Sequence, residues 1–311
     1  MLPSPLPRGV LPAGDHVPVI ERTVQPAGPY SLALSARLAG DATRVFREGR
    51  LDAVVAPGGR PERAAAWQRP DGSVVLRAAS EEGLAALRWQ LALDDDHSPF
   101  LERFADDPLL GATLRELRGL RQLRVGSVAQ SLLRALCGQL IEASRARAIE
   151  RAIVRAVAPA VGPPAATTTG SVQLHAPPSS AQLASLAPAQ LRAHGLHARR
   201  GATLVRVCRA LDLERLHGVS TELAAARLER ERGLGAWSAG VVCLEGLGRP
   251  ERGLVGDLGL VVLLGKLTGR RVEGHETAAL LEPYGEWAGL ASVYLLAGLG
   301  RGLVPSGVAA A

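Results

Sequence analysis

The sequence predicts an α+β protein in which a mixed N-terminal domain is followed by a mostly α-helical core. The chain has 311 residues, of which 47% are hydrophobic, so it is long and apolar enough to bury a substantial core. Strand-like alternation and a hairpin signal are concentrated before residue 98. After that point nearly every segment has the 3.6-residue apolar period of a helix, with breaks at Gly, Pro or Ser.

The N-terminal α+β domain is predicted over residues 17–97. Residues 17–24 alternate as a strand does, and residues 66–78 form a hairpin pattern around Pro70-Asp71-Gly72. Residues 31–40 fit either a strand or a helix.

A helix is expected to close this domain. Ser80 is a suitable N-cap for residues 81–93, in which the leucines of one face recur at helical spacing. Residues 1–16 are proline-rich and are expected to form a mobile tail rather than a signal peptide.

The helical core is predicted over residues 98–304. Its apolar-periodic segments are residues 99–117, 127–157, 179–186, 187–195, 197–211, 220–232, 236–247, 257–267, 275–284 and 285–298. The helix near residues 98–117 is expected to join the C-terminal helices in one lobe. Residues 159–178 are rich in Pro, Gly and Thr and are expected to be a loop or a partly ordered insertion.

Composition limits the function without defining it. The chain has 36 basic and 30 acidic residues, a net charge of +6, and every basic residue except Lys266 is arginine. Such a surface suits a polyanion such as nucleic acid, but a merely solvated arginine surface is equally compatible. Three separated cysteines and the acidic run Asp94-Asp95-Asp96 do not have metal-ligand spacing, so we expect no metal and an intracellular, reduced protein without a membrane span.

The most informative segment lies at residues 220–246. Two helical patterns are joined by Gly233-Leu234-Gly235, and the second begins at Ala236. The glycines allow left-handed backbone and leave the amides of the turn open, so the turn could hold a phosphate oxygen at the positive end of the second helix. Glycine as a simple helix terminator is the alternative.

A second informative segment lies at residues 253–267. Asp257 precedes another apolar helix and stands 22 residues after Gly235. An aspartate at such a place is a good N-cap, and this structural role is compatible with a chemical one.

Residues 228–260 carry a specific resemblance. The segment LERERGLGAWSAGVVCLEGLGRPERGLVGDLGL resembles the helix-hairpin-helix, Gly/Pro-rich loop and aspartate signature of the DNA glycosylase superfamily that includes endonuclease III. The Trp after the hairpin and the Gly-Asp-Leu-Gly form are similar to the 3-methyladenine DNA glycosylase II branch, the AlkA type. Residues 132–153 and 183–211 resemble further segments of that family.

This resemblance implies an architecture and an activity. It implies an N-terminal domain with the topology of the TATA-binding protein and a core of two helical lobes that face each other across a cleft. It also implies base-excision repair, with Asp257 as the catalytic carboxylate. A carboxylate suits this reaction, because departure of a base leaves positive charge on the deoxyribose ring.

One position predicts the outcome of the reaction. Relatives that also cut the strand carry a lysine two residues after the second hairpin glycine, where this chain has Trp237. The amine of that lysine forms a Schiff base with the sugar. We therefore expect a monofunctional enzyme that leaves an abasic site.

The resemblance also suggests pocket residues. Trp237 and an aromatic ring from Tyr284 or Trp287 match the places where the family has rings that stack on a cationic base, although each ring could equally pack in the core. Gln139 could face the flipped nucleotide or be a structural glutamine.

The expected DNA grip consists of Gly233, Leu234, Gly235 and Ala236 of the hairpin together with Lys266. A wedge that fills the gap left by a flipped base is expected at Leu120 or Leu123, either of which could instead belong to the core.

Two valines depart from the family pattern. Val241 stands where a pocket tyrosine is expected, and Val261 where a basic residue often follows the aspartate. These departures leave open a helix-hairpin-helix DNA-binding protein with weak chemistry. A glycosylase for oxidised bases also stays open, because the run Tyr-Gly-Glu-Trp-Ala-Gly from Tyr284 resembles branches that remove oxidised guanine. The expected partner is damaged duplex DNA, bound by a monomer in a bacterial-type cytoplasm, with no cofactor other than a possible monovalent cation at the hairpin.

Overall fold

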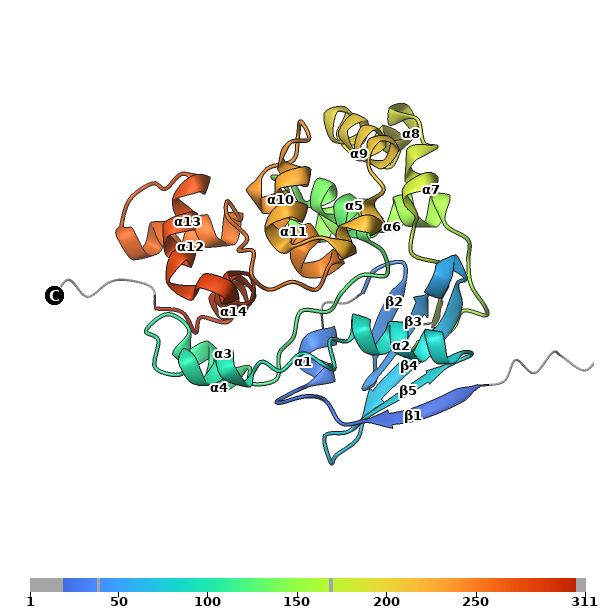
Figure 1. Ribbon diagram of the computed structural model, residues 1–311, viewed down its shortest axis with the longest axis horizontal. Helices are drawn as coiled ribbons and strands as arrows, with labels where there is room; N and C mark the ends of the chain where they lie inside the picture. The colour runs from blue at the N-terminus through green and yellow to red at the C-terminus, as the bar shows by residue number, and fades with distance from the viewer. Residues whose placement is uncertain (1–18, 38–39, 168–169, 306–311) are drawn as a thin grey trace, which may run out of the picture.

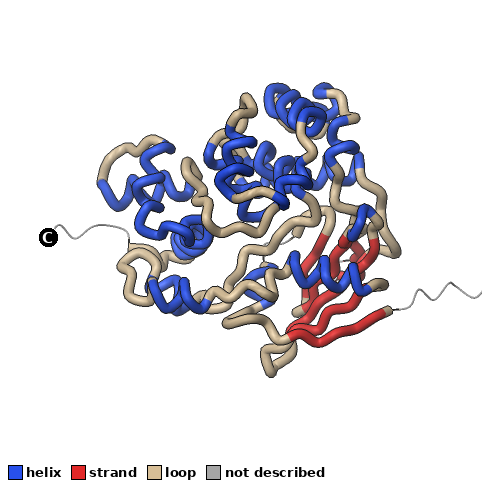
Figure 2. The backbone as a smooth tube through the Cα atoms, viewed as in Figure 1, coloured by secondary structure: helices blue, strands red, loops and turns tan. Residues whose placement is uncertain are grey.

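The computed structural model describes residues 19–37, 40–167 and 170–305. The predicted tail at residues 1–16 lies outside this range. Helices make up most of the molecule, and the main sheet occupies one corner of it (Figure 2). In the described part of the chain, no helix is both long and apolar enough to cross a bilayer.

The N-terminal part is a five-stranded antiparallel sheet in the order β1-β5-β4-β3-β2, with helix α2 packed on it (Figure 1). Its elements are β1 (Ile20–Val24), α1 (Leu32–Ala36), β2 (Arg44–Arg47), β3 (Arg50–Val55), the short 3-10 turn η1 (Pro57–Gly59), β4 (Glu62–Gln68), β5 (Val74–Ala78) and α2 (Glu81–Gln90). A core of Leu, Val and Ala side chains lies between the sheet and the helices.

Local signals in this part behave as predicted. The Asp71 carboxylate accepts hydrogen bonds from the Ser73 amide at 2.9 Å and the Ser73 hydroxyl at 2.6 Å, which closes the β4–β5 hairpin. Ser80 caps α2 by accepting from the Gly83 amide at 2.9 Å. The ambiguous residues 31–40 contain helix α1, capped by Ser31.

The helical core forms two further packed groups. The hairpin lobe contains α5 (Val128–Gly138), α6 (Ala143–Val157), α7 (Ser180–Ala184), α8 (Pro188–Ala193), α9 (Ala198–Ala210), η2 (Leu213–Gly218), α10 (Thr221–Glu229) and α11 (Ala236–Val241), which continues as the π-helical turn η3 (Val242–Gly246). The C-terminal lobe contains α3 (Ser98–Arg103), α4 (Gly111–Glu116), α12 (Leu258–Thr268), η4 (Gly274–Glu276), α13 (Thr277–Leu281), η5 (Glu282–Trp287) and α14 (Ala288–Leu299).

The C-terminal lobe is built from two separated pieces of chain. Phe100 and Leu114, from α3 and α4, share one buried cluster with Leu260 of α12 and Tyr294 of α14. Figure 1 shows α3 and α4 beside α14, far from their sequence neighbours. Residues 98–117 join the C-terminal helices as the sequence predicts, but they form the two short helices α3 and α4 and not the single helix expected.

The segment predicted as one helix over residues 127–157 is two helices. α5 ends at Gly138 and α6 begins at Ala143, because Leu140 has a left-handed backbone with φ of 55°. The break creates a tip that periodicity alone cannot reveal.

The connection at residues 159–178 is a partly ordered insertion. It contains the short strands β6 (Ala165–Thr167) and β7 (Gly170–Val172), and the His175 amide donates to the Ala42 carbonyl at 2.8 Å. Leu174 is fully buried in the core of the hairpin lobe. Apolar burial therefore orders a segment whose composition is typical of a loop.

The acidic run Asp94-Asp95-Asp96 makes ion pairs and hydrogen bonds, whereas a solvated linker was predicted. Asp94 pairs with Arg88, Asp95 pairs with Arg124, and Asp96 accepts from the amide of Ser98. Among the described residues, no group of His, Cys, Asp and Glu side chains is arranged to hold a metal ion.

Candidate active site and DNA-binding hairpin

The hairpin between α10 and α11 exposes its backbone at the glycines. Gly233 has φ of 94°, and a Cβ there would lie 2.6 Å from the Thr203 hydroxyl, so both conformation and space require glycine. Leu234 is only 7% exposed and anchors the turn in the lobe core, whereas Gly235 is exposed and precedes the first turn of α11. The first amides of a helix have no intrahelical acceptor, so those at Ala236 and Trp237 are available to an anion.

Gln139 connects the end of α5 to this hairpin. Its amide nitrogen donates to the Gly233 carbonyl and to the Ser238 hydroxyl, both at 3.0 Å. This is the structural role that the sequence left open for Gln139, and a contact to a flipped nucleotide stays a prediction.

Asp257 lies where α11 and α12 meet. Its Oδ1 atom accepts from the Gly259 amide at 2.8 Å, so Asp257 is the N-cap of α12, as its place in the sequence suggests. Its Oδ2 atom accepts from the indole Nε1 of Trp237 at 2.9 Å. Trp237 and Asp257, which carry the most specific sequence signal, are thus hydrogen-bonded to each other.

The half-buried Trp237 ring packs on the end of α5. A Cβ at Gly138 would lie 2.9 Å from ring atom Cη2, so the glycine allows the close approach. The ring also contacts the apolar core of the C-terminal lobe. The Trp237 ring therefore connects the end of α5 to the Asp257 carboxylate at the start of α12.

The two other candidate rings lie in the C-terminal lobe. Tyr284 is 3% exposed, packs edge-on against Phe104 and donates to Asp107 at 3.3 Å, which is the core-packing alternative rather than an open pocket wall. Burial, with Asp107 adding to the effect, raises the pKa of the Tyr284 hydroxyl. Trp287 is half-buried, and its ring centroid lies 5.9 Å from that of Phe100.

The two predicted wedge residues pack against apolar cores in the structure, which is the alternative left open for both. Leu123 is 2% exposed and belongs to the core of the sheet domain, so it cannot enter a DNA stack without leaving that core. Leu120 packs against the C-terminal lobe, and its carbonyl accepts from the Tyr294 hydroxyl at 2.9 Å.

Leu140 is a more exposed candidate for the wedge, which the sequence pattern did not single out. It directly follows Gln139, is 78% exposed and stands on a left-handed residue at the tip between α5 and α6. With so much of its surface exposed, this large apolar side chain gains little from packing on its own protein. Gly138, a glycine inside the apolar-periodic segment, was the available signal for a helix end there.

Lys266 and the two departing valines occupy different surroundings. Lys266 is exposed in the last turn of α12, about 13 Å along the helix axis from Asp257 at 1.5 Å per residue. Val241 is 6% exposed in a core, where it packs instead of lining a pocket. Val261 is half-buried, and its neighbour Val262 is 51% exposed.

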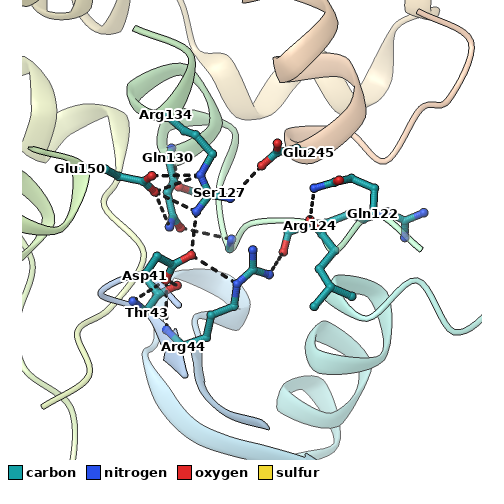
Figure 3. Close-up of polar contacts among 12 residues, drawn as sticks. Asp41, Thr43, Arg44, Gln122, Arg124, Ser127, Gln130, Arg134, Glu150 and Glu245 are labelled. Carbon is teal, nitrogen blue, oxygen red and sulfur yellow. Dashed lines mark hydrogen bonds and ion pairs between the residues drawn. The ribbon is translucent and has the colours of Figure 1, made fainter. Parts of the chain in front are cut away.

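A buried charge cluster that the sequence did not reveal lies behind α5 (Figure 3). Arg134 of α5 pairs with Asp41 at 2.7 Å, with Glu150 at 2.9 Å and with Glu245 at 2.7 Å, and Asp41 also pairs with Arg44. These five residues, the Arg134 cluster, come from the sheet domain and three segments of the hairpin lobe. They fix α5 against both.

Burial and neighbouring charges shift the pKa values of the cluster members in different directions. Burial disfavours the charge of Asp41, but the attraction of Arg44 and Arg134 outweighs burial and lowers the pKa of Asp41. Burial dominates at Glu150 and raises its pKa, although Arg134 opposes the effect. Burial would also lower the pKa of Arg134, but its three carboxylates raise it well above the usual value.

Comparisons with known proteins show what the whole chain is similar to. No protein-family model matches the chain. It is 25% identical, over 232 residues, to a Bacillus subtilis protein named DNA-3-methyladenine glycosylase. This match covers 72% of this chain and 75% of that protein. The chain is 28% identical over 268 residues to a Mycobacterium tuberculosis protein named probable bifunctional transcriptional activator/DNA repair enzyme AlkA; the match covers 79% of this chain but only 53% of that protein.

Solved structures give the fold. A 3-methyladenine DNA glycosylase from Archaeoglobus fulgidus matches with a TM-score of 0.77 and 18% identity, covering 90% of this chain and 98% of that one. A Clostridium acetobutylicum 8-oxoguanine glycosylase/lyase in complex with DNA matches with a TM-score of 0.72 and 15% identity, covering 92% and 99%.

The helix-rich fold with its five-stranded antiparallel sheet is therefore that of the helix-hairpin-helix DNA glycosylases. The chain is also a homologue of proteins named DNA-3-methyladenine glycosylase and AlkA, which confirms the family resemblance that the sequence shows.

Proposed function

We propose that this protein is a monofunctional DNA glycosylase that hydrolyses the N-glycosidic bond of damaged, alkylated purines in duplex DNA and leaves an abasic site. The observation that carries the proposal is the Asp257 carboxylate, fixed at the start of α12 by Gly259 and by Trp237, which itself directly follows the hairpin. The names of the homologues support the choice of alkylated bases.

The proposed chemistry follows from the charge of Asp257. As the base leaves, positive charge develops on the sugar, and a fixed carboxylate stabilises that transition state or orients the attacking water. No lysine stands at position 237 to form a Schiff base, and the single lysine of the chain, Lys266, lies at the far end of α12. Water is then the nucleophile, and strand cleavage is not expected.

The proposed DNA contacts are divided between two tips. The open amides at Ala236 and Trp237, directly after Gly235, bind a backbone phosphate, and Leu140 enters the stack to replace the flipped nucleotide. A target atom inside a duplex cannot be reached otherwise. Because Gln139 bonds to Gly233, the two tips are held at a fixed separation.

The remaining expectations belong to the same proposal. The protein acts as a monomer, and its N-terminal domain has the topology of the TATA-binding protein. A monovalent cation at the hairpin would need carbonyls other than that of Gly233, which already accepts from Gln139.

A glycosylase for oxidised bases is the second candidate. The burial of the Tyr284 ring favours it, because a pocket with fewer open aromatic faces attracts a cationic alkylated base less strongly.

One assay separates these functions. Purified protein is incubated with methylated duplex DNA and with duplexes that contain hypoxanthine or 8-oxoguanine, and strand breaks are measured before and after alkali. We expect release of 3-methyladenine, with strand breaks that require alkali. Breaks without alkali contradict the monofunctional mechanism, preferential release of 8-oxoguanine supports the second candidate, and duplex binding without base release identifies a non-enzymatic DNA-binding protein.

A further inference from the structure

The indole of Trp237 faces Asp257 with its N–H edge, whereas a pocket wall would present a ring face. We infer that Trp237 is a positioning residue, which holds the Asp257 carboxylate in its reactive orientation through the indole N–H. This inference rests on the base-release function proposed above and assigns a role to the residue that replaces the lysine.

The carboxylate has two anchors from two helices. Gly259, on the aspartate's own helix α12, binds Oδ1, and Trp237, on α11, binds Oδ2. With the Gly259 bond alone, the carboxylate could still rotate about its side-chain bonds while one oxygen stayed bonded. The second bond fixes the plane of the carboxylate and ties it to the hairpin helix.

The donor is itself held in place. Gly138 brings the backbone of α5 close to one edge of the ring, and the apolar core of the C-terminal lobe contacts it as well. Ser238, the next residue of α11, is 2% exposed and accepts from Gln139. A side chain packed in this way loses little further entropy when it holds the carboxylate.

An indole is suited to this role because it is a neutral donor. A lysine ammonium at hydrogen-bond distance would offset most of the charge of Asp257, and that charge is what stabilises a cationic sugar. The indole N–H orients the carboxylate and leaves its full negative charge in place. The same substitution that excludes Schiff-base chemistry thereby improves Asp257 for hydrolysis.

The kinetic test uses Trp237→Phe, which keeps an aromatic ring and removes the N–H. Under single-turnover conditions with methylated duplex, we expect base release to slow roughly 10- to 100-fold, as for the loss of an orienting hydrogen bond, while the Kd for the duplex changes less than threefold. Trp67→Phe is the matched control, since Trp67 lies on the sheet domain between Arg50 and Arg77.

A second variant keeps the indole N–H of Trp237 but shifts it relative to the Asp257 carboxylate. Gly138→Ala places a methyl group against the Trp237 ring, and we expect the same selective loss of rate. If both variants release base at the wild-type rate, or if rate and duplex affinity fall together, the inference is wrong.

A spectroscopic test reads the hydrogen bond without any activity. The chain has four tryptophans, so the ¹⁵N–¹H spectrum contains four indole signals, and the one lost in Trp237→Phe identifies Trp237. In Asp257→Ala this signal should move upfield more than the other three, and an unmoved signal overturns the inference. If wild-type protein releases no base from any substrate, the proposed function fails, and the role inferred for Trp237 fails with it.

Discussion

Two groups of carboxylates in this molecule are held in opposite ways. The Arg134 cluster is closed and redundant, because Arg134 contacts three carboxylates and Asp41 has a second partner in Arg44. The Asp257 site is open and sparse, with two neutral hydrogen-bond donors and no cation paired with the carboxylate in the described structure. The closed group neutralises its charges, and the open group keeps one charge available.

Helix α5 connects the two groups. Arg134 anchors its middle between the sheet domain and the hairpin lobe, while Gly138, Gln139 and Leu140 at its end meet Trp237, the hairpin and the solvent. The rigid ion-pair cluster and the proposed reactive site therefore lie at different points along one helix. Variants of the closed group should therefore change stability, and variants of the open end should change rate.

The largest expected effect on stability comes from Arg134→Met. Removing this side chain leaves Asp41 and Glu150, each at most 3% exposed, without their shared cation. Loss of one partner of a buried ion pair costs roughly 3–5 kcal/mol, and we expect a loss of this size in urea unfolding. Arg88→Met, which breaks an exposed pair with Asp94, is the control and should cost at most about 1 kcal/mol. Equal losses in the two variants would contradict the proposed difference.

The second effect is a dependence of stability on pH at His97. This side chain is 7% exposed and lines a small cavity with Asp95 and Arg124, next to the Arg134 cluster. Burial, followed by repulsion from Arg121, lowers the pKa of His97 to about 4.

Below the usual histidine pKa of about 6.5, the unfolded chain binds a proton that the folded chain does not bind. Stability should therefore fall as the pH decreases from about 6.5 to 4, by up to about 3 kcal/mol from this residue. In His97→Gln the decrease measured by urea unfolding at each pH should be smaller by that amount. If the free energy of unfolding depends on pH in the same way in the two proteins, His97 is not the source of the decrease.

The third effect belongs to the open end of α5. Leu140→Ala should leave the free energy of unfolding within about 0.5 kcal/mol of the wild type, because the side chain is 78% exposed. Base release should slow roughly tenfold, because the gap left by the flipped nucleotide is no longer filled. Leu223→Ala, at an exposed leucine of α10, is the control with no expected loss of rate. A destabilised Leu140→Ala protein, or one with unchanged rate, would remove Leu140 as the wedge.

The smallest effect is expected for Lys266→Ala. If Lys266 contacts a phosphate, the slope of log binding constant against log salt should decrease in size by about one, with a modest loss of affinity. Binding to duplex DNA is measured at several salt concentrations. An unchanged slope would mean that Lys266, in the last turn of α12, does not contact a phosphate.

Local signals in the sequence predicted much of this molecule. The cap at Ser80, the turn at Asp71 and the N-cap at Asp257 depend on neighbours within a few residues, so pattern and propensity reveal them.

Features that depend on distant packing were not predictable in this way. Arg134 pairs with residues 93 and 111 positions away, and no local pattern announces such partners. Tyr284 could equally line a pocket or fill a core until Phe104 and Asp107 were placed beside it. Leu140 was hidden because helical periodicity continues through the break between α5 and α6.

The central claim is that the charge of Asp257 drives base release, and Asp257→Asn tests it most directly. Asparagine keeps the shape of the side chain and can still accept from Gly259, so duplex binding should be unchanged. Asp106→Asn, at an exposed position of the same lobe, is the control. The account predicts that Asp257→Asn releases 3-methyladenine at less than about one thousandth of the wild-type single-turnover rate, in the range seen when transition-state charge stabilisation is lost. Release at the wild-type rate would contradict it.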